Sequence, residues 1–251
     1  MNFLVDVGNS RIKWGTEAIG VCSPLGNEPR PSHDIPALLD RCWANIPTPD
    51  KVLVSNVAGA GVAKFIVEWV KHRWERDVTL VTPPATGWGV TNGYNDHRRL
   101  GADRWAKLVA IRRHVDGNAF IVDFGTAVTM DVLDHSGLHH GGLILPGLQA
   151  MRKSLASSTH GVKIQDGAVA EGRYGLLARD TVGAVMGGTT YALVATVERV
   201  AADVEAAMES SVRRIVTGGD APKLLPLLVS DFEYVPNLVL SGLAIMATQP
   251  E

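Results

Sequence analysis

Two short stretches combine an apolar run, an aspartate and a glycine turn, which together could bind a phosphate and its cation. They are Phe3-Leu4-Val5-Asp6-Val7-Gly8-Asn9-Ser10 and Phe120-Ile121-Val122-Asp123-Phe124-Gly125-Thr126-Ala127. Glycine lets the backbone approach a ligand closely, so that turn amides can point at an anion. Each stretch alone is also compatible with a tight β-turn and a solvated aspartate. Because the pattern occurs twice, we favour phosphate binding and a duplicated unit.

The first stretch continues to Lys13 and offers several kinds of phosphate ligand. The turn amides and the side chains of Asn9 and Ser10 could meet the β- and γ-phosphates of a nucleotide, and Lys13 would add positive charge. Asp6 would face Mg²⁺, since carboxylates and phosphate oxygens are the ligands that this ion prefers.

A third candidate is Thr217-Gly218-Gly219-Asp220, which follows a predicted strand and opens a predicted helix. Its glycines could let the backbone approach the adenosine part of a nucleotide. The same pattern is also common where a strand and a helix merely pack together, so it is weak by itself.

The fourth candidate is Gly101-Ala102-Asp103-Arg104 at the start of a predicted helix. An aspartate at this place is often only a cap or a partner of the helix dipole. Alternatively, Asp103 could be a general base that takes a proton from a substrate hydroxyl as it attacks phosphorus. The residues by themselves leave both interpretations open.

Other signals are weaker or absent. His135, His139 and His140 surround a predicted hairpin, where a solvated turn is favoured over a metal site. The chain has no P-loop, no Rossmann glycine fingerprint after a strand and no serine-centred nucleophile elbow.

The elements that must position these residues follow an α/β pattern that occurs twice. Each half begins with a predicted meander of strands, followed by alternating helices and strands in a mixed sheet flanked by helices. Asp116-Gly117-Asn118 marks the boundary, which predicts domains at 1–117 and 118–251. Within the first half, residues 24–34 and 83–95 are predicted to be loops, and we expect a helix to start at Pro146 in the second half.

Composition indicates a globular protein without a general affinity for polyanions. Of 251 residues 46% are hydrophobic, and the net charge is −2, so we do not expect nucleic acid as a partner. Two cysteines, Cys22 and Cys42, are too few for a disulfide framework. No signal peptide and no membrane-spanning stretch are recognisable, which predicts a cytoplasmic protein that does not enter a membrane.

Taken in order, the motifs resemble the type III pantothenate kinase family, which includes the Bvg accessory factor proteins. The resemblance covers nearly the whole chain, and its specificity comes from the order of several motifs. Three of these motifs are the stretches at Asp6, Gly101 and Asp123 described above. The others are Tyr94, Gly141-Gly142-Leu143-Ile144-Leu145-Pro146-Gly147, Asp180-Thr181 and Thr217-Gly218-Gly219.

The resemblance implies two duplicated ribonuclease-H-like domains, as in the superfamily of actin-like ATPases and sugar kinases. It implies ATP-dependent phosphorylation of pantothenate to 4′-phosphopantothenate, the first step of coenzyme A biosynthesis, by a cytoplasmic homodimer. Asp103 would be the proton acceptor, and Mg²⁺ would accompany ATP, with Asp6 as an outer ligand. Asp123 would belong to a monovalent-cation site for potassium or ammonium.

The family's binding residues are carried over position by position. Those implied for ATP are Asp6, Val7, Gly8, Asn9, Ser10, Arg11, Ile12, Lys13, Thr126, Gly218 and Gly219. Those implied for pantothenate are Tyr94, Gly101, Ala102, Asp103, Arg104 and Thr181, and in the implied homodimer Thr181 could come from the partner subunit.

Two departures and two alternatives accompany this resemblance. Many family members carry proline where His97 stands, and the long helix predicted over 181–208 contains Gly187-Gly188-Thr189-Thr190, which would change its packing at a dimer interface. The alternatives are a nucleotide-binding accessory or regulatory protein on the same scaffold, and a related small-molecule kinase or polyphosphate phosphatase.

Overall fold

The computed structural model describes residues 1–159 and 177–249 and consists of two compact units. The first comprises Met1–Asp116, Leu133–Gly141 and Asn237–Glu251, and the second comprises Gly117–Val132 and Gly142–Pro236. The chain changes unit near the predicted boundary, but its last segment packs with the first unit. A division into domains at residues 117 and 118 therefore stays a proposal.

The first unit is built on a five-stranded sheet with the order β3-β2-β1-β4-β5. Strands β1 (Asn2–Val7), β2 (Arg11–Ala18) and β3 (Val21–Pro29) form an antiparallel meander. Strand β4 (Lys51–Asn56) pairs in parallel with β1, and β5 (Val78–Leu80) pairs in parallel with β4. This mixed sheet confirms the predicted meander and the α/β class.

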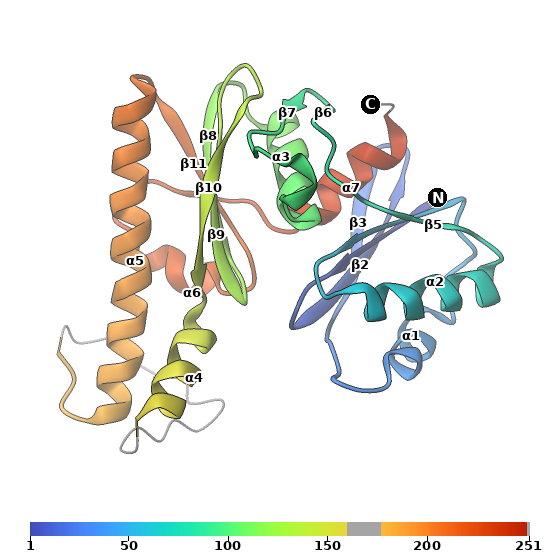
Figure 1. Cartoon of the computed structure of the whole chain (residues 1–251), viewed down its shortest axis with the longest axis horizontal. Coiled ribbons are helices and arrows are strands. Elements are labelled where there is room, and N and C mark those ends of the chain that lie inside the picture. Colours follow the sequence, from blue (N-terminus) through green and yellow to red (C-terminus); the bar gives the residue numbers. More distant parts are fainter. Residues whose placement is uncertain (160–176, 250–251) are drawn as a thin grey trace. The chain divides into compact units, whose positions relative to one another are not determined.

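One face of this sheet is covered by α1 (Ile35–Trp43) and α2 (Ala60–Trp74), as Figure 1 shows. Alternate strand residues point to opposite faces, so Phe3, Val5 and Val7 share the side of the sheet that packs on these helices. Asp34 caps α1 through a bond from the Ala37 amide, and Pro36 occupies the first turn, where a missing N–H costs nothing.

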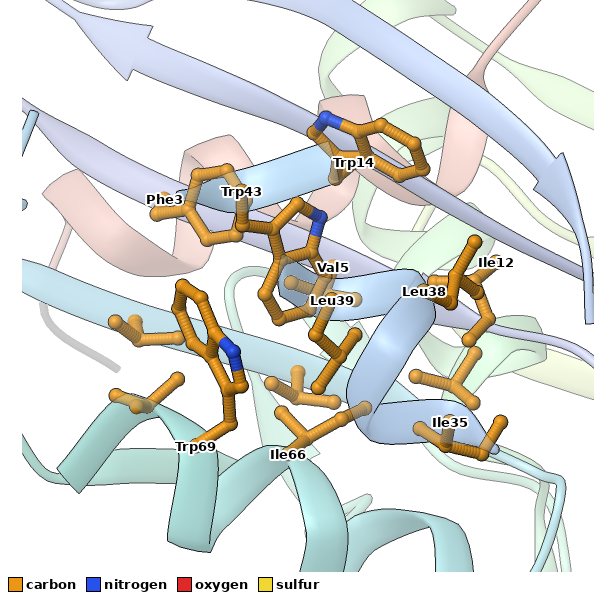
Figure 2. Packing of buried hydrophobic residues seen from close by; sticks show 14 of the residues in the cluster. Phe3, Val5, Ile12, Trp14, Ile35, Leu38, Leu39, Trp43, Ile66 and Trp69 are labelled. Carbon is orange, nitrogen blue, oxygen red and sulfur yellow. The ribbon is translucent and has the colours of Figure 1, made fainter. Parts of the chain in front are cut away.

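Four tryptophans gather in this core, although they are scattered along the sequence, and Figure 2 labels Trp14, Trp43 and Trp69 among them. Trp43 lies at the centre, with ring centroids 5.1 Å from Phe3, 5.6 Å from Trp69, 6.2 Å from Trp14 and 6.3 Å from Trp74. Three of these pairs meet edge to face, a favourable geometry for aromatic rings.

The opposite face carries α7 (Leu238–Thr248), which contacts β1 and β4 and packs closely against α3 (Ala102–His114). The two helices approach at Gly242, where a Cβ would lie 1.9 Å from the carbonyl oxygen of Ala106. A side chain larger than hydrogen would therefore push the helices apart. This crossing holds α3, and with it Asp103, against the sheet.

Two predicted loops of the first unit contain strands. Residues 24–29 belong to edge strand β3, which tolerates Pro24 and Pro29 because an edge strand leaves backbone groups unpaired. Gly26 is required there, since a Cβ would lie 2.0 Å from the Trp14 ring.

Within 83–95, β6 (Thr86–Gly87) and β7 (Val90–Thr91) form a hairpin. Its two turn residues, Trp88 and Gly89, both have positive φ, as a tight hairpin turn demands. The short helical turn η1 (His97–Arg99) follows.

The second unit is built on a five-stranded sheet with the order β10-β9-β8-β11-β12, which matches β3-β2-β1-β4-β5 of the first unit strand by strand. Its strands are β8 (Asn118–Phe124), β9 (Ala127–Leu133), β10 (His139–Pro146), β11 (Val212–Thr217) and β12 (Glu233–Tyr234). Strand β11 pairs in parallel with β8 and β12. The predicted duplication is thus confirmed by topology as well as by motif.

Helices α4 (Leu148–Ser158) and α5 (Thr181–Met208) pack together, and Leu193 and Val197 of α5 lie in the core that this unit builds on its sheet. Buried Arg152 of α4 donates to the hydroxyls of Thr189 and Thr190, at 3.1 and 3.4 Å. The two threonines of the Gly187-Gly188-Thr189-Thr190 segment therefore bind α5 to α4 through hydrogen bonds. The predicted helix start at Pro146 is wrong, because Pro146 ends β10 and α4 begins at Leu148.

The remaining elements are α6 (Ala221–Leu224) and the short turn η2 (Leu225–Leu227). Among the helices within residues 1–159 and 177–249, none has the combined length and apolar character needed to cross a membrane.

Candidate active site

A backbone hydrogen bond closes the first glycine turn, which lies between β1 and β2. The Gly8 amide donates to the Arg11 carbonyl at 2.9 Å, and a Cβ on Gly8 would lie only 3.2 Å from that oxygen. Asn9 and Ser10 are exposed at the tip. Polar atoms at this turn are therefore presented to solvent, where a phosphate could bind.

Two arginines brace this turn. The Arg30 guanidinium donates twice to the Asn9 carbonyl, at 2.9 and 2.7 Å, and the Arg30 amide donates to the Ser10 carbonyl at 2.8 Å. Arg11 is bound to Asn27 on β3, at 2.5 Å to Oδ1 and 2.7 Å to the carbonyl oxygen. Sequence reasoning missed Arg30, because only the pairing of β3 with β2 brings it to the turn.

The predicted ATP residues around this turn divide between two faces of the sheet. Val7 and Ile12 are fully buried in the hydrophobic core, so only their backbone could contact a ligand. Asp6 and Lys13 are register partners on the opposite face. Asp6 is buried near the end of β1, with 8% of the residue exposed.

The second glycine turn, between β8 and β9, is surrounded by further glycines. Gly147 donates its amide to the Thr126 carbonyl at 3.1 Å, and a Cβ on Gly147 would lie 2.3 Å from the Gly125 carbonyl oxygen. Gly218 has a φ of +98°, and a Cβ there would lie 2.4 Å from Asp123 Oδ1. The structure thus brings Asp123, Thr126 and Gly218 together within the second unit.

A hydroxyl residue stands beside each aspartate in the sheet register. Ser55 of β4 is the partner of Asp6, and Thr217 of β11 is the partner of Asp123. Both hydroxyl residues are buried. Sequence reasoning did not single out Ser55, because the equivalence appears only when the two sheets are compared.

The fourth candidate segment lies at the N-terminus of α3. Gly101 is the N-cap, and a Cβ on it would lie 2.5 Å from Asp103 Oδ1, so that oxygen lies directly over the glycine. The other oxygen, Oδ2, is 3.8 Å from Nζ of Lys107. The Asp103 side chain is 24% exposed, so solvent or a substrate can still reach the carboxylate.

Tyr94 and Arg104, both predicted to bind pantothenate, contact each other. Arg104 Nη1 donates to the Tyr94 hydroxyl, and its guanidinium carbon is 5.3 Å from the Tyr94 ring centroid. The other neighbour of Tyr94 is His139, whose ring stacks on it at 5.9 Å with an interplanar angle of 16°. His139 is completely buried, so the expectation of a solvated turn is wrong for this histidine.

Asn92 holds the loop that carries Tyr94. Its side-chain amide donates to the carbonyls of Pro84 and His97, at 3.3 and 3.2 Å, and its Oδ1 accepts from the Tyr94 amide at 3.1 Å. The next residue, Gly93, passes so close to the β9–β10 hairpin that a Cβ would lie 1.7 Å from the His139 carbonyl oxygen. The Asn-Gly pair was the sequence signal for this sharp loop.

Thr181 belongs to the second unit and is exposed at the start of α5. Asp180 caps that helix through a 2.8 Å bond from the Gly183 amide. Together with Ala150, Leu155 and Val185, Thr181 lines a groove of about 1070 Å³ between α4 and α5. The remaining predicted pantothenate residues, by contrast, lie in the first unit.

The β9–β10 turn is organised by Asp134. Its carboxylate accepts from the Ser136 hydroxyl and amide and from the Leu138 amide, and it lies 2.8 Å from His140 Nε2. Partial burial alone would raise the pKa of Asp134, but these hydrogen bonds outweigh it and hold the pKa well below its usual range. His140 is therefore paired with Asp134, and no group of three or more possible metal-binding side chains is found among the described residues.

Replacing Asp134 by asparagine should reduce stability near neutral pH by about 1–3 kcal/mol, the cost typical of a lost charged hydrogen-bond acceptor. Because the folded-state pKa is lowered, the contribution is present above the unfolded pKa of about 3.9 and is lost as the pH falls below it. Urea unfolding between pH 2 and 8 should show the two proteins converging in acid. Asp116→Asn, at an exposed site, is the control, and a gap of constant size at all pH values would contradict the prediction.

The two aspartates at the strand ends fit a nucleotide-associated cation better than a preformed metal cage. No group of three or more histidine, cysteine or acidic side chains able to hold an ion occurs within residues 1–159 and 177–249. Mg²⁺ often binds through one or two carboxylates together with substrate phosphates. Single carboxylates beside glycine turns, such as Asp6 and Asp123, match that kind of donor set.

Comparisons with known proteins agree with this arrangement. The family model described as type III pantothenate kinase matches residues 2–203. A type III pantothenate kinase of Nitrosococcus oceani is 40% identical over 252 residues, covering 98% of this chain and 94% of the relative. One from Alkalilimnicola ehrlichii is 35% identical, with coverage of 98% and 97%.

A solved structure also supports the fold. A Sinorhizobium meliloti protein described as a 2-dehydro-3-deoxygalactonokinase is similar over 100% of both chains, with a TM-score of 0.57 and 15% sequence identity. At this identity the likeness concerns the fold alone. With the duplicated sheets, it confirms the predicted actin-like ATPase and sugar-kinase fold.

Proposed function

This chain belongs to the type III pantothenate kinase family, and from that premise we propose how its residues perform ATP-dependent phosphorylation of pantothenate. The reaction yields 4′-phosphopantothenate and is the first step of coenzyme A biosynthesis. The observation that carries the residue assignment is the N-terminus of α3, where the Asp103 carboxylate lies over Gly101 and the next residue, Arg104, contacts Tyr94.

Asp103 is the general base of this proposal. It accepts the proton of the pantothenate hydroxyl as that oxygen attacks the γ-phosphorus of ATP, and ADP leaves. A carboxylate is sufficient, because phosphoryl transfer depends more on positioning and charge stabilisation than on a strong base. Tyr94, Gly101, Ala102 and Arg104 line the acceptor. Tyr94 is held by its contacts with His139 and Arg104 and is half-buried, and its remaining exposed surface would contact pantothenate.

The two glycine turns hold the donor. Residues 6–13 supply backbone amides, the Asn9 and Ser10 side chains and the positive charge of Lys13, while Val7 and Ile12 contribute backbone only. Thr126 adds a donor from the second turn, and Gly218 and Gly219 leave room for the adenosine part. Arg30 stabilises the conformation of the first turn through its hydrogen bonds to the Asn9 carbonyl oxygen.

Cations and assembly complete the proposal. Mg²⁺ bound with ATP would supply charge neutralisation at the phosphates, and Asp6 would hold it through water. Asp123 would bind potassium or ammonium. We further propose a cytoplasmic homodimer, in which Thr181 reaches pantothenate from the partner subunit. The exposed groove beside Thr181 supports an interface in this region.

An ADP-release assay tests the activity. With Mg²⁺ and potassium present, ADP should appear with pantothenate, and mass spectrometry should detect the phosphorylated product. Sugars and polyphosphate should give no comparable rate.

Replacing potassium by sodium should lower turnover if Asp123 is a monovalent-cation site, and an equal rate would contradict that assignment. ATP binding without turnover on any of these compounds would instead favour an accessory, regulatory protein.

A further inference from the structure

We propose that Lys107 is a positioning residue that holds the Asp103 carboxylate in its reactive orientation. This inference rests on the proposed role of Asp103 as the base. Lys107 lies one turn further along α3, and its Nζ is 3.8 Å from Asp103 Oδ2. Its side chain is only 2% exposed, which is rare for a lysine.

Burial makes this contact significant. An exposed lysine–carboxylate pair on a helix stabilises the fold only weakly and orders its side chains poorly. A buried ammonium, by contrast, loses its hydration and needs a compensating negative charge. Asp103 provides such a charge, so the lysine has a strong electrostatic reason to keep the carboxylate beside it.

The carboxylate is also restrained on its other side. Oδ1 lies over Gly101, close enough that a Cβ there would be 2.5 Å away. With Oδ1 above the glycine and Oδ2 toward Lys107, rotation of the carboxylate is limited while part of it remains open to solvent. A proton acceptor that is preorganised in this way loses little entropy when the substrate hydroxyl arrives.

The direction of the pair adds to this effect. An acidic residue four positions before a lysine is the favourable order in a helix, and an acidic residue in the first turn also suits the helix dipole. Asp103 and Lys107 satisfy both conditions in α3. Buried Lys107 therefore acts on pantothenate through Asp103 and is not itself a catalytic residue.

The test compares Lys107→Met, Lys107→Arg, Asp103→Asn and the double variant Asp103→Asn/Lys107→Met in the full-length protein. Methionine keeps the length and the apolar stem but removes the charge. Lys64→Met is the matched control: Lys64 also forms a four-residue-spaced pair, at 3.7 Å from Glu68, but on the exposed surface of α2. Thermal unfolding and far-UV circular dichroism check that each variant folds.

We expect Lys107→Met to lower kcat with pantothenate about 10- to 100-fold while KM for pantothenate and ATP changes less than about threefold, as expected when only a reacting group is misplaced. Lys107→Arg should recover part of kcat, and Lys64→Met should leave it unchanged. In the Asp103→Asn background, Lys107→Met should cause no further loss, because both act through one carboxylate. If methionine prevents folding, Lys107→Gln takes its place in the same comparison.

Other results would overturn the inference. A kcat within twofold of the parent, a loss confined to KM, or an equal further loss in the Asp103→Asn background would each exclude a positioning role for Lys107. If the unaltered protein does not phosphorylate pantothenate, the proposed function itself fails and this inference fails with it. An active parent with an unaffected Lys107→Met variant would remove the inference and leave the proposed function intact.

Discussion

Replacing Asp103 by asparagine should lower kcat for pantothenate phosphorylation by about 10²- to 10⁴-fold, the range typical of losing a general base. Asparagine has nearly the same shape, but its amide cannot accept the hydroxyl proton. Its carbonyl and amide groups can still lie over Gly101 at the start of α3. We therefore expect the variant to fold and to bind ATP with an affinity close to that of the parent.

The measurement is single-turnover ADP formation, together with ATP binding by calorimetry. Asp77→Asn, at a carboxylate with 92% side-chain exposure, controls for the loss of one negative charge. The rival interpretation makes Asp103 only a partner of the helix dipole. It predicts a stability loss of about 0.3–1 kcal/mol with turnover retained. Near-normal turnover with reduced stability would thus assign Asp103 to the helix and not to the chemistry.

Replacing Trp43 by alanine should destabilise the first unit by about 3–5 kcal/mol, as is typical when a large aromatic side chain is removed from a core. Trp43 is completely buried at the centre of the aromatic cluster in Figure 2. Its indole N–H has no hydrogen-bond partner within residues 1–159 and 177–249, so the loss would come from packing alone.

Urea unfolding followed by circular dichroism measures this loss. Trp43→Phe should cost clearly less, because it keeps an aromatic ring in contact with Phe3 and Trp69 and removes the unpaired N–H. Phe65→Ala is the control, since Phe65 lies on α2 with 43% exposure and should change stability by less than about 0.5 kcal/mol. A similar cost for Phe65→Ala and Trp43→Ala would show that the cluster has no special role.

Much of the candidate site could be predicted because its residues are neighbours in the chain. The pairs Asp6 and Gly8, Asp123 and Gly125, and Gly101 and Asp103 are each two residues apart, so local spacing determines much of their geometry. The start of α5 at Thr181 and its end at Met208 were likewise predictable from helical periodicity.

The supporting residues could not be predicted, because long-range pairing places them. Arg30 reaches the first turn only through the β2–β3 register, and His139 reaches Tyr94 only because two loops far apart in sequence meet. Residues 24–29 of strand β3 were mistaken for a loop for the same reason. Its two prolines and its glycine argue against a strand locally, whereas its position at the sheet edge permits one.

The sequence by itself determined the duplicated α/β architecture, the two glycine turns with their aspartates and the family, since each depends on short-range patterns. Only the tertiary structure decided that four dispersed tryptophans form one core, that α7 packs with the first unit, and that Lys107 is buried beside Asp103. Burial depends on which distant segments cover a residue. Local spacing can place Lys107 four residues from Asp103, but it cannot tell whether water or protein surrounds that pair.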